Sequence, residues 1–222
     1  MIDKRRAGVH EMLEACPGLE DGATVLVGGF GDAGVPVQLV EALAGLGLRE
    51  LTLVSNNAGA GNHGIAALLE SRSVRRIVCS FPRSAGSHVF EALHAAGDIE
   101  LELVPQGTLA ERLRAGGAGI PAFFTPTGYG TPLAQGKETR VFDGRGHVLE
   151  FALRGDVALV HAASGDRHGN LAYAKTARNF NPVMAAAART TLAEVRGFVD
   201  ALDPEAVVTP GIYVTRLCEV RA

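Results

Sequence analysis

The sequence predicts an α/β protein built on an open, mostly parallel, doubly wound sheet with a β-rich second half. In the first half, short β-rich runs alternate four times with helical patterns, which is typical of parallel β-α units with right-handed connections. In the second half, strand-like runs follow one another around glycine-containing turns. No internal repeat or low-complexity linker divides the chain, so residues 1–222 are expected to form one domain.

The elements of the first half follow from the spacing of apolar residues. From residue 5 onward, apolar positions recur at helical spacing as far as Cys16 and predict an opening amphipathic helix. A further helix is expected to start near Pro36, because proline suits the first helical turn. The remaining expected elements are strands at Thr24–Val27, Leu51–Val54, Arg76–Cys79 and Ile99–Val104, and helices at Ile65–Leu69, Val89–His94 and Leu109–Leu113.

The second half begins with a glycine- and proline-rich segment, Ala115–Thr131, which we expect to be an irregular loop. Because this loop is rich in apolar residues, we expect it to pack against a partner chain together with the final strand. Arg140–Phe142 and His147–Phe151 flank an Asp-Gly turn and predict a β-hairpin. The other expected elements are strands at Val157–Val160, Leu171–Tyr173, Leu192–Arg196 and Ile212–Leu217, and a helix at Val183–Arg189.

The composition excludes several classes of protein. The chain has 222 residues, 47% of them hydrophobic and 20% charged, and a formal net charge of −3, with the basic residues scattered. Neither a nucleic-acid partner nor a membrane surface is expected from this pattern. There is no apolar stretch of about 18 residues and no signal peptide, so the expected location is the cytoplasm. Cys16, Cys79 and Cys218 are expected to be buried thiols of a reducing compartment.

A glycine-rich turn follows the first expected strand. Gly29-Phe30-Gly31-Asp32-Ala33-Gly34 fits the G-x-G-x-x-G pattern of a dinucleotide site, in which backbone amides face a pyrophosphate. Phe30 and Asp32, however, occupy positions where phosphate oxygens should approach. The strand Leu51–Val54 also ends in Ser55-Asn56-Asn57 instead of the acidic residue that would hold a ribose. A nicotinamide cofactor is therefore not expected.

The same stretch resembles the signature of the class I CoA-transferases, in their alpha (A) subunits. The resemblance rests first on Asp21-Gly22, Val25-Leu26-Val27, Gly28-Gly29-Phe30 and Gly34-Val35-Pro36. Further blocks in the family's order lie at 55–59, 104–112, 116–131, 136–138, 169–171, 175–181 and 209–214. The resemblance therefore covers nearly the whole chain and implies the fold of an alpha subunit.

The resemblance also implies a reaction and a partner. Relatives of this kind move CoA from a donor such as succinyl-CoA to an acceptor carboxylate through a glutamyl-CoA thioester. Their nucleophilic glutamate lies in the beta half, in a Ser-Glu-Asn-Gly motif that this chain lacks. No catalytic residue is therefore expected in this chain, which should be active only with a beta subunit, in a heterodimer or a dimer of heterodimers. CoA thioester enters as substrate, and no permanently bound cofactor is expected.

Neutral amide side chains are the expected ligands of the acyl group. Asn56, Asn57 and Gln106 follow predicted parallel strands, at the edge where open α/β sheets bind ligands, and their NH₂ groups could donate to an acyl oxygen. The resemblance places them, with Gly107, beside the acyl site; the alternative is that they cap turns. Gly28, Gly29, Phe30, Gly31, Gly34 and Pro36 are expected to shape the site, with Phe30 in the core.

Two branches of the family compete for the acceptor. Cys79-Ser80-Phe81-Pro82-Arg83 resembles the 3-oxoadipate branch, whereas the succinyl-CoA:3-oxoacid branch tends to carry Val-Gly-Glu-Asn there. Arg83 could clamp the remote carboxylate of 3-oxoadipate, or it could simply face solvent. His161-Ala162-Ala163-Ser164 and Ala174 depart from the basic residues expected there, which leaves acetoacetate open as the acceptor.

Two further alternatives concern the class of protein. His63, His161, Asp166 and His168 could suggest a metal site, but histidines in polar loops are usually solvated, so no metal is expected. A non-catalytic acyl-CoA-binding protein on the same fold also stays open, because this chain lacks the nucleophile. A beta subunit encoded in a neighbouring reading frame would favour the enzyme.

Overall fold

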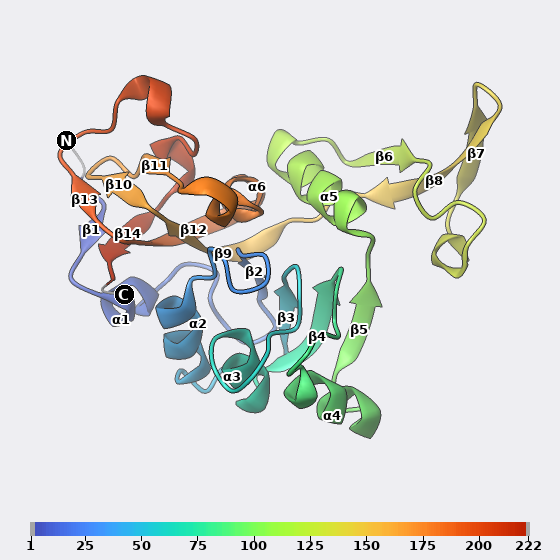
Figure 1. Cartoon of the computed structure of the whole chain (residues 1–222), viewed down its shortest axis with the longest axis horizontal. Coiled ribbons are helices and arrows are strands. Elements are labelled where there is room, and N and C mark those ends of the chain that lie inside the picture. Colours follow the sequence, from blue (N-terminus) through green and yellow to red (C-terminus); the bar gives the residue numbers. More distant parts are fainter. Residues whose placement is uncertain (1–2, 221–222) are drawn as a thin grey trace.

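The computed structural model describes residues 3–220 and is dominated by one eight-stranded sheet (Figure 1). The strand order is β1-β14-β12-β9-β2-β3-β4-β5, and every neighbouring pair is parallel. Its strands are β1 (Arg5–Arg6), β2 (Thr24–Val27), β3 (Leu51–Val54), β4 (Val74–Cys79), β5 (Glu100–Leu103), β9 (Gly155–Ala162), β12 (Ala188–Val195) and β14 (Arg216–Glu219). The predicted α/β fold class, with an open and mostly parallel sheet, is confirmed.

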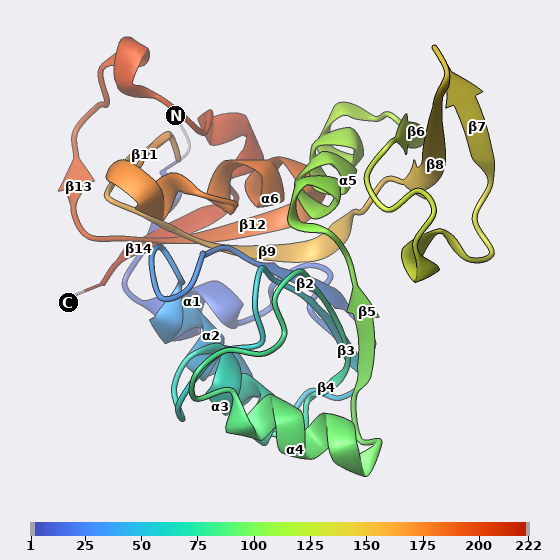
Figure 2. The same cartoon turned by 45° about the vertical axis from the view of Figure 1, so that its right-hand side comes forward.

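Helices cover both faces of this sheet, as Figures 1 and 2 show. One face carries α1 (Val9–Leu13), α2 (Val37–Ala44), α3 (Ile65–Glu70) and α4 (His88–Ala96), and the other carries α5 (Gln106–Ala118) and α6 (Asn181–Ala187). Alternate residues of each strand enter the two cores: Val25 and Val27 face the first group of helices, and Leu26 faces the second. This burial on both faces explains why the central strands are almost wholly apolar.

The strand order identifies the point at which the chain stops adding strands on one side of β2 and begins to add them on the other side. From β2 the chain winds outward through β3, β4 and β5, and then returns to add β9 on the other side of β2. Open α/β sheets bind ligands at the carboxyl ends of strands near such points. The residues that follow β2, β3, β4 and β5 therefore lie where a site is expected.

Two smaller sheets stand apart from the large one. β6 (Ala122–Thr125), β7 (Thr139–Phe142) and β8 (Arg145–Phe151) form an antiparallel arm that projects beyond α5 (Figures 1 and 2). We call residues 122–151 the arm. The second sheet contains β10 (Ser164–Asp166), β11 (Leu171–Ala172) and β13 (Phe198–Val199). Short 3₁₀ turns lie at Pro132–Ala134, Lys175–Arg178, Pro204–Ala206 and Gly211–Tyr213.

The expectation of an irregular loop over Ala115–Thr131 is wrong. α5 continues to Ala118, and β6 begins at Ala122. Gly116 and Gly117 do not break the helix; they permit close packing. A Cβ on Gly116 would lie 2.2 Å from the carbonyl oxygen of Leu153, and one on Gly117 would lie 3.0 Å from Ala186 on α6. The glycines are needed because α5 approaches its neighbours closely.

Smaller errors also have physical causes. The opening helix is preceded by β1, whose two residues pair with β14 at the far end of the chain. The strand expected over Ile212–Leu217 begins only at Arg216, because Gly211–Tyr213 is a 3₁₀ turn held by Lys4 Nζ, 2.6 Å from the Gly211 carbonyl oxygen. The helix expected to reach Arg189 ends at Ala187, where β12 starts to pair with β9. The Arg140–Phe142 hairpin is confirmed.

Candidate functional site

A cleft lies at the carboxyl ends of β3, β4 and β5. Its volume is about 600 Å³. Its walls come from the glycine turn, the segments after β3 and β4, and the start of α5: Phe30, Gly31, Asp32, Asn56, Asn57, Gly59, Ala60, Ser80, Phe81, Ser84, Ala85 and Gln106. We call it the main cleft. Among the residues expected at the site, Asn56, Asn57, Gln106, Phe30 and Gly31 meet here.

Asn56 and Gln106 lie in direct contact, although 50 positions separate them in the sequence. The Gln106 Nε2 donates to the Asn56 Oδ1 at 2.8 Å. Asn56 is 4% exposed, and its Nδ2 has no hydrogen-bond partner within residues 3–220. Because Gln106 occupies the amide oxygen, the NH₂ group of Asn56 remains available to a ligand in the main cleft.

Asn57 lies in the same cleft, but its contacts are those of a loop residue. Its Oδ1 accepts from the Gly59 N–H at 2.8 Å, and its Nδ2 donates to the Gly31 carbonyl at 3.3 Å. It therefore ties the segment after β3 to the glycine turn. Its side chain has less left to offer a ligand than that of Asn56.

The glycine turn packs against α6 and the segment before it. A Cβ on Gly28 would lie 1.9 Å from the Asn181 Oδ1, and one on Gly34, whose φ is +69°, would lie 2.3 Å from the Ala177 carbonyl oxygen. Gly29 has φ +125°, a conformation that side chains rarely adopt. Gly28 and Gly34 allow the turn to approach the protein's own chain closely, but neither they nor Gly29 line the main cleft. Pro36 lies at the N-cap of α2, one residue before the first helical turn in which it was expected.

A carboxylate already lies at the start of α2, where a dinucleotide would place its pyrophosphate. Glu194 on β12 is buried, and its Oε2 accepts from the Leu39 N–H at 3.1 Å. Its Oε1 lies 3.2 Å from the Nδ1 of His161. The G-x-G-x-x-G pattern of this chain therefore forms a turn whose helix is capped from within the protein.

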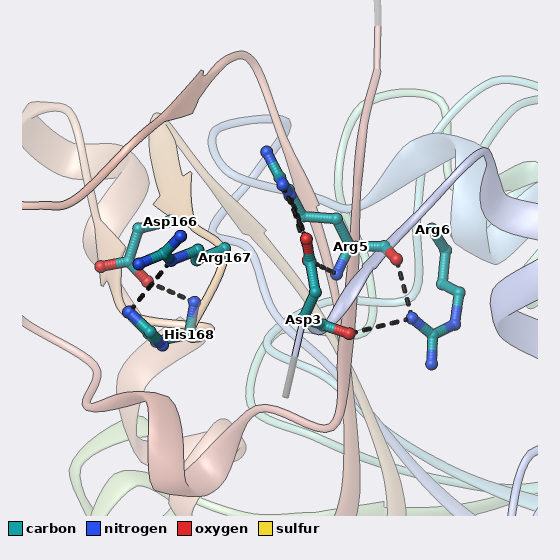
Figure 3. A network of polar contacts seen from close by, with 6 residues as sticks. All are labelled: Asp3, Arg5, Arg6, Asp166, Arg167 and His168. Carbon is teal, nitrogen blue, oxygen red and sulfur yellow. Dashed lines mark hydrogen bonds and ion pairs between the residues drawn. The ribbon is translucent and has the colours of Figure 1, made fainter. Parts of the chain in front are cut away.

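Asp166 and His168 belong to a separate polar network (Figure 3). The buried Asp166 carboxylate accepts from the N–H groups of His168, Asn170 and Leu202 and from the Asn170 side chain. Burial alone would raise the pKa of Asp166, but these hydrogen bonds together lower it. Within residues 3–220, no three His, Cys, Asp or Glu side chains come together as a metal site would require.

Aromatic side chains rim the main cleft. Phe30 is 49% exposed and Phe81 is 59% exposed, so the expectation that Phe30 lies in the core is wrong. The turn holds Phe30 outward through a bridge to Ala33. Phe30 and Gln106 also line an adjoining cleft of about 310 Å³, and the expected Gly107 lies in that one. The first turn of α5 thus separates the two clefts.

Arg83 is exposed and lies between Phe81 and Ser84, both of which line the main cleft, although Arg83 itself does not. It has no ion-pair partner in the described part of the chain. Sequence reasoning did not assign Asp32 or Ser80 to the site, although both lie in the cleft wall. Asp32 is its one charged residue, and Ser80 contributes a buried hydroxyl. The position of Ser80 directly after β4, like that of Asn56 after β3, could have signalled it.

The main cleft offers hydrogen-bond donors but no activated nucleophile. No histidine, lysine, arginine or cysteine is among the described residues that line it. The three cysteines are buried, as expected, and burial raises the pKa of Cys79 to about 12. Neutral donors in a concave site are suited to stabilising an oxyanion that another group generates.

No helix among the described residues is long and apolar enough to cross a membrane.

The family model for coenzyme A transferase matches residues 9–219. The chain is 55% identical to the A subunit of 3-oxoadipate CoA-transferase from Pseudomonas putida, over 99% of this chain and 95% of the relative. It is 54% identical to the A subunit of succinyl-CoA:3-ketoacid coenzyme A transferase from Xanthomonas campestris pv. campestris, over 89% of this chain and 81% of the relative.

Solved structures agree on the fold. Glutaconate coenzyme A-transferase from Acidaminococcus fermentans superimposes with a TM-score of 0.85 at 17% identity, over 98% of this chain and 76% of that one. An acyl-CoA transferase from E. coli O157:H7, solved as a thioester complex with CoA, gives a TM-score of 0.82 at 22% identity. It matches 99% of this chain and 47% of that longer one. From the fold, the cleft and these similarities together, the chain belongs to the coenzyme A transferase family.

Proposed function

We propose that this chain is the alpha subunit of a CoA-transferase that moves CoA from succinyl-CoA to a 3-oxoacid, 3-oxoadipate in the first place. The observation that carries the proposal is the main cleft, which has neutral donors converging from three strand ends and no glutamate among its described lining residues, where the one carboxylate is the exposed Asp32. A thioester exchange needs a carboxylate that attacks the acyl carbon. A beta subunit supplies that carboxylate, as a glutamate.

The proposed reaction consists of two acyl-transfer steps with the donor, followed by the same two steps in reverse with the acceptor. The partner's glutamate attacks the donor thioester, and CoA leaves as a thiolate while a mixed anhydride forms. The thiolate then attacks the glutamyl carbonyl, so succinate departs and a glutamyl-CoA thioester remains. The acceptor carboxylate repeats the two steps in reverse. Each attack places negative charge on an oxygen, which preorganised donors stabilise.

Asn56 and Gln106 are the donors that we assign to that oxygen. Their mutual hydrogen bond fixes both amides, so little reorganisation is needed when charge develops. Asn57 and the glycine turn hold the wall in place, and Gly107 opens the adjoining cleft. No cation is among the described residues that line the main cleft, so the lining forms no ion pair with the attacking carboxylate, which keeps its reactivity.

The proposed partner surface includes the arm. Val141 on β7 is 66% exposed and Phe151 on β8 is 64% exposed, and Tyr129 and Ile120 of the segment Ala115–Thr131 are also exposed. Apolar surface of this kind is typical of an interface between subunits. We propose that this segment, the arm and residues 212–217, where Ile212 is 83% exposed, contact the beta subunit in a heterodimer or a dimer of heterodimers.

The choice of 3-oxoadipate as the acceptor rests on the positive charge of Arg83. Within residues 3–220, Arg83 is an unpaired cation beside the main cleft, and 3-oxoadipate has a remote carboxylate that acetoacetate lacks. Arg83→Met should lower kcat/KM for 3-oxoadipate by roughly 10- to 150-fold, as for the loss of one charged hydrogen bond, with succinyl-CoA saturating. Acetoacetate, measured on the same preparation, should lose much less. Equal losses would remove Arg83 from acceptor choice and favour the 3-oxoacid alternative.

The test of the proposed function is covalent labelling. The chain is co-purified with the product of the neighbouring reading frame, incubated with succinyl-CoA and treated with borohydride, which reduces a glutamyl thioester to an alcohol. Mass spectrometry should find one modified glutamate, on the partner chain. Of the fifteen glutamates of this chain, Glu138 is the best local candidate, but Arg140 Nε donates to its Oε1 at 2.8 Å and stabilises its charge. A modified Glu138, or any other label in this chain, would overturn its assignment as the alpha subunit.

A second outcome separates the enzyme from the binding protein. If the chain binds acyl-CoA but forms no complex with the neighbouring product, and no transfer occurs with 3-oxoadipate or acetoacetate, it is a binding protein on this fold.

A further inference from the structure

Ser80 occupies the position after β4 that Asn56 occupies after β3. The two strands pair with Val54 opposite Val78, so two residues further on Asn56 lies opposite Ser80. The N–H groups of Ser80 and Phe81 both donate to the Asn56 carbonyl, at 3.1 and 3.0 Å. The segments after the two strands therefore stay side by side beyond the sheet.

The side chain of Ser80 is directed toward the face where α5 begins. Val54 and Val78 belong to the core beneath α5 and α6, and side chains two residues apart on an extended chain point the same way. Asn56 follows this rule, since it meets Gln106 at the first residue of α5. Ser80 lies next to Asn56 on the same face and lines the main cleft.

The hydroxyl of Ser80 has no hydrogen-bond partner in the described chain. Within residues 3–220, three side-chain polar atoms that are themselves closed off from solvent are in this state: Ser80 Oγ, His94 Nδ1 and Thr108 Oγ1. Of these three residues, Ser80 alone lines the main cleft. Buried polar groups in folded proteins are almost always paired, so an orphan hydroxyl in a cleft wall indicates a partner that arrives with a ligand.

We infer that Ser80 is a further donor of the acyl site, and that its hydroxyl, turned about the Cα–Cβ bond, donates to an oxygen of the bound acyl group or acceptor carboxylate beside the Asn56 amide. The inference rests on the proposed function and adds a residue to the same site. Ser80 is not assigned as a nucleophile, because no histidine or lysine among the described lining residues could take its proton.

The test uses the reconstituted complex with succinyl-CoA and 3-oxoadipate. Ser80→Ala should lower kcat/KM by roughly 10- to 100-fold, and Ser80→Cys, which keeps the shape but is a weak donor, should lose a similar amount. Neither change should lower the Tm, because the hydroxyl makes no bond within the described chain. Thr108→Val is the matched control: it removes an equally buried and unpartnered hydroxyl outside the cleft, and kcat/KM should not change.

Failure of this inference is distinct from failure of the proposed function. If the wild-type complex transfers CoA and Ser80→Ala keeps the wild-type kcat/KM, Ser80 has no role in the site. A lowered Tm with full activity would make Ser80 a structural residue. If the wild-type complex transfers no CoA, the proposed function fails, and calorimetric titration with succinyl-CoA decides on Ser80: an unchanged dissociation constant in Ser80→Ala, or no binding by the wild type, overturns the inference.

Discussion

Two polar networks of this chain differ in whether their hydrogen bonds are complete. Around Asp166, the carboxylate accepts four N–H groups, and Lys4 Nζ donates to the carbonyls of Gly211 and Val214, in and just after the neighbouring 3₁₀ turn (Figure 3 shows the Asp166 end). In the main cleft, one NH₂ group of Asn56 and the hydroxyl of Ser80 have no partner within residues 3–220. A saturated network holds the fold, whereas an unsaturated one in a cleft is prepared for a ligand.

The first test of this comparison removes the Asp166 carboxylate from the saturated network. Asp166→Ala leaves four partly buried N–H donors without an acceptor, so the free energy of unfolding in urea should fall by about 3–5 kcal/mol. Asp203→Ala is the matched control, because Asp203 accepts a single N–H, from Glu205 in an exposed turn, and should cost about 1 kcal/mol. Equal losses for the two variants would mean that the Asp166 network does not hold the fold.

The second test removes a donor from the main cleft. Gln106→Ala should lower kcat/KM of the complex by about 10- to 1,000-fold, the range for one oxyanion-type donor, with little change in the free energy of unfolding. Asn56→Ala should behave similarly. Asn62→Ala is the control. It removes an exposed amide from the loop after β3, the strand that Asn56 also follows, but Asn62 lines neither cleft, so kcat/KM should not change. Wild-type activity in the Gln106 and Asn56 variants would return both residues to a turn-capping role.

The same contrast explains what could be predicted from sequence. The apolar runs that form β2 and β3 are predictable to the residue, because burial on both faces leaves a pattern that does not depend on distant partners. The helical state of residues 115–118 could not be predicted, since its glycines are required by contacts with Leu153 and Ala186 far along the chain. β1 escapes prediction for the same reason, because its partner strand lies at the other end of the sequence.

The types of residue at the site could be predicted from the sequence, but whether each polar group has a hydrogen-bond partner could not. Amides after parallel strands indicated Asn56 and Gln106, yet their mutual hydrogen bond depends on how α5 returns over the sheet. Asn57 fits the same sequence rule, although both ends of its amide bond the backbone. Whether a polar group is satisfied is a property of tertiary contacts, so sequence alone could not distinguish Asn57 from Asn56 or identify Ser80.

The smallest expected effect is the loss of stability at low pH when the Asp166 carboxylate takes up a proton. The pKa of Asp166 is lower in the folded chain than in the unfolded one, so its contribution to stability is complete above the unfolded value, about 3.9, and is lost as the pH falls through the folded value. Asp166→Asn has no charge to lose at this position. The difference in free energy of unfolding between wild type and Asp166→Asn should therefore be constant from pH 7 to about pH 5 and shrink below that, by on the order of 1 kcal/mol for each unit by which the pKa is lowered. Urea titrations at each pH measure this difference and cancel the effect of the other carboxylates, such as Glu102, whose pKa is also lowered. A difference that stays constant down to pH 3 would show that the four N–H donors do not favour the charged carboxylate, and the Asp166 network would then hold the fold by its geometry alone.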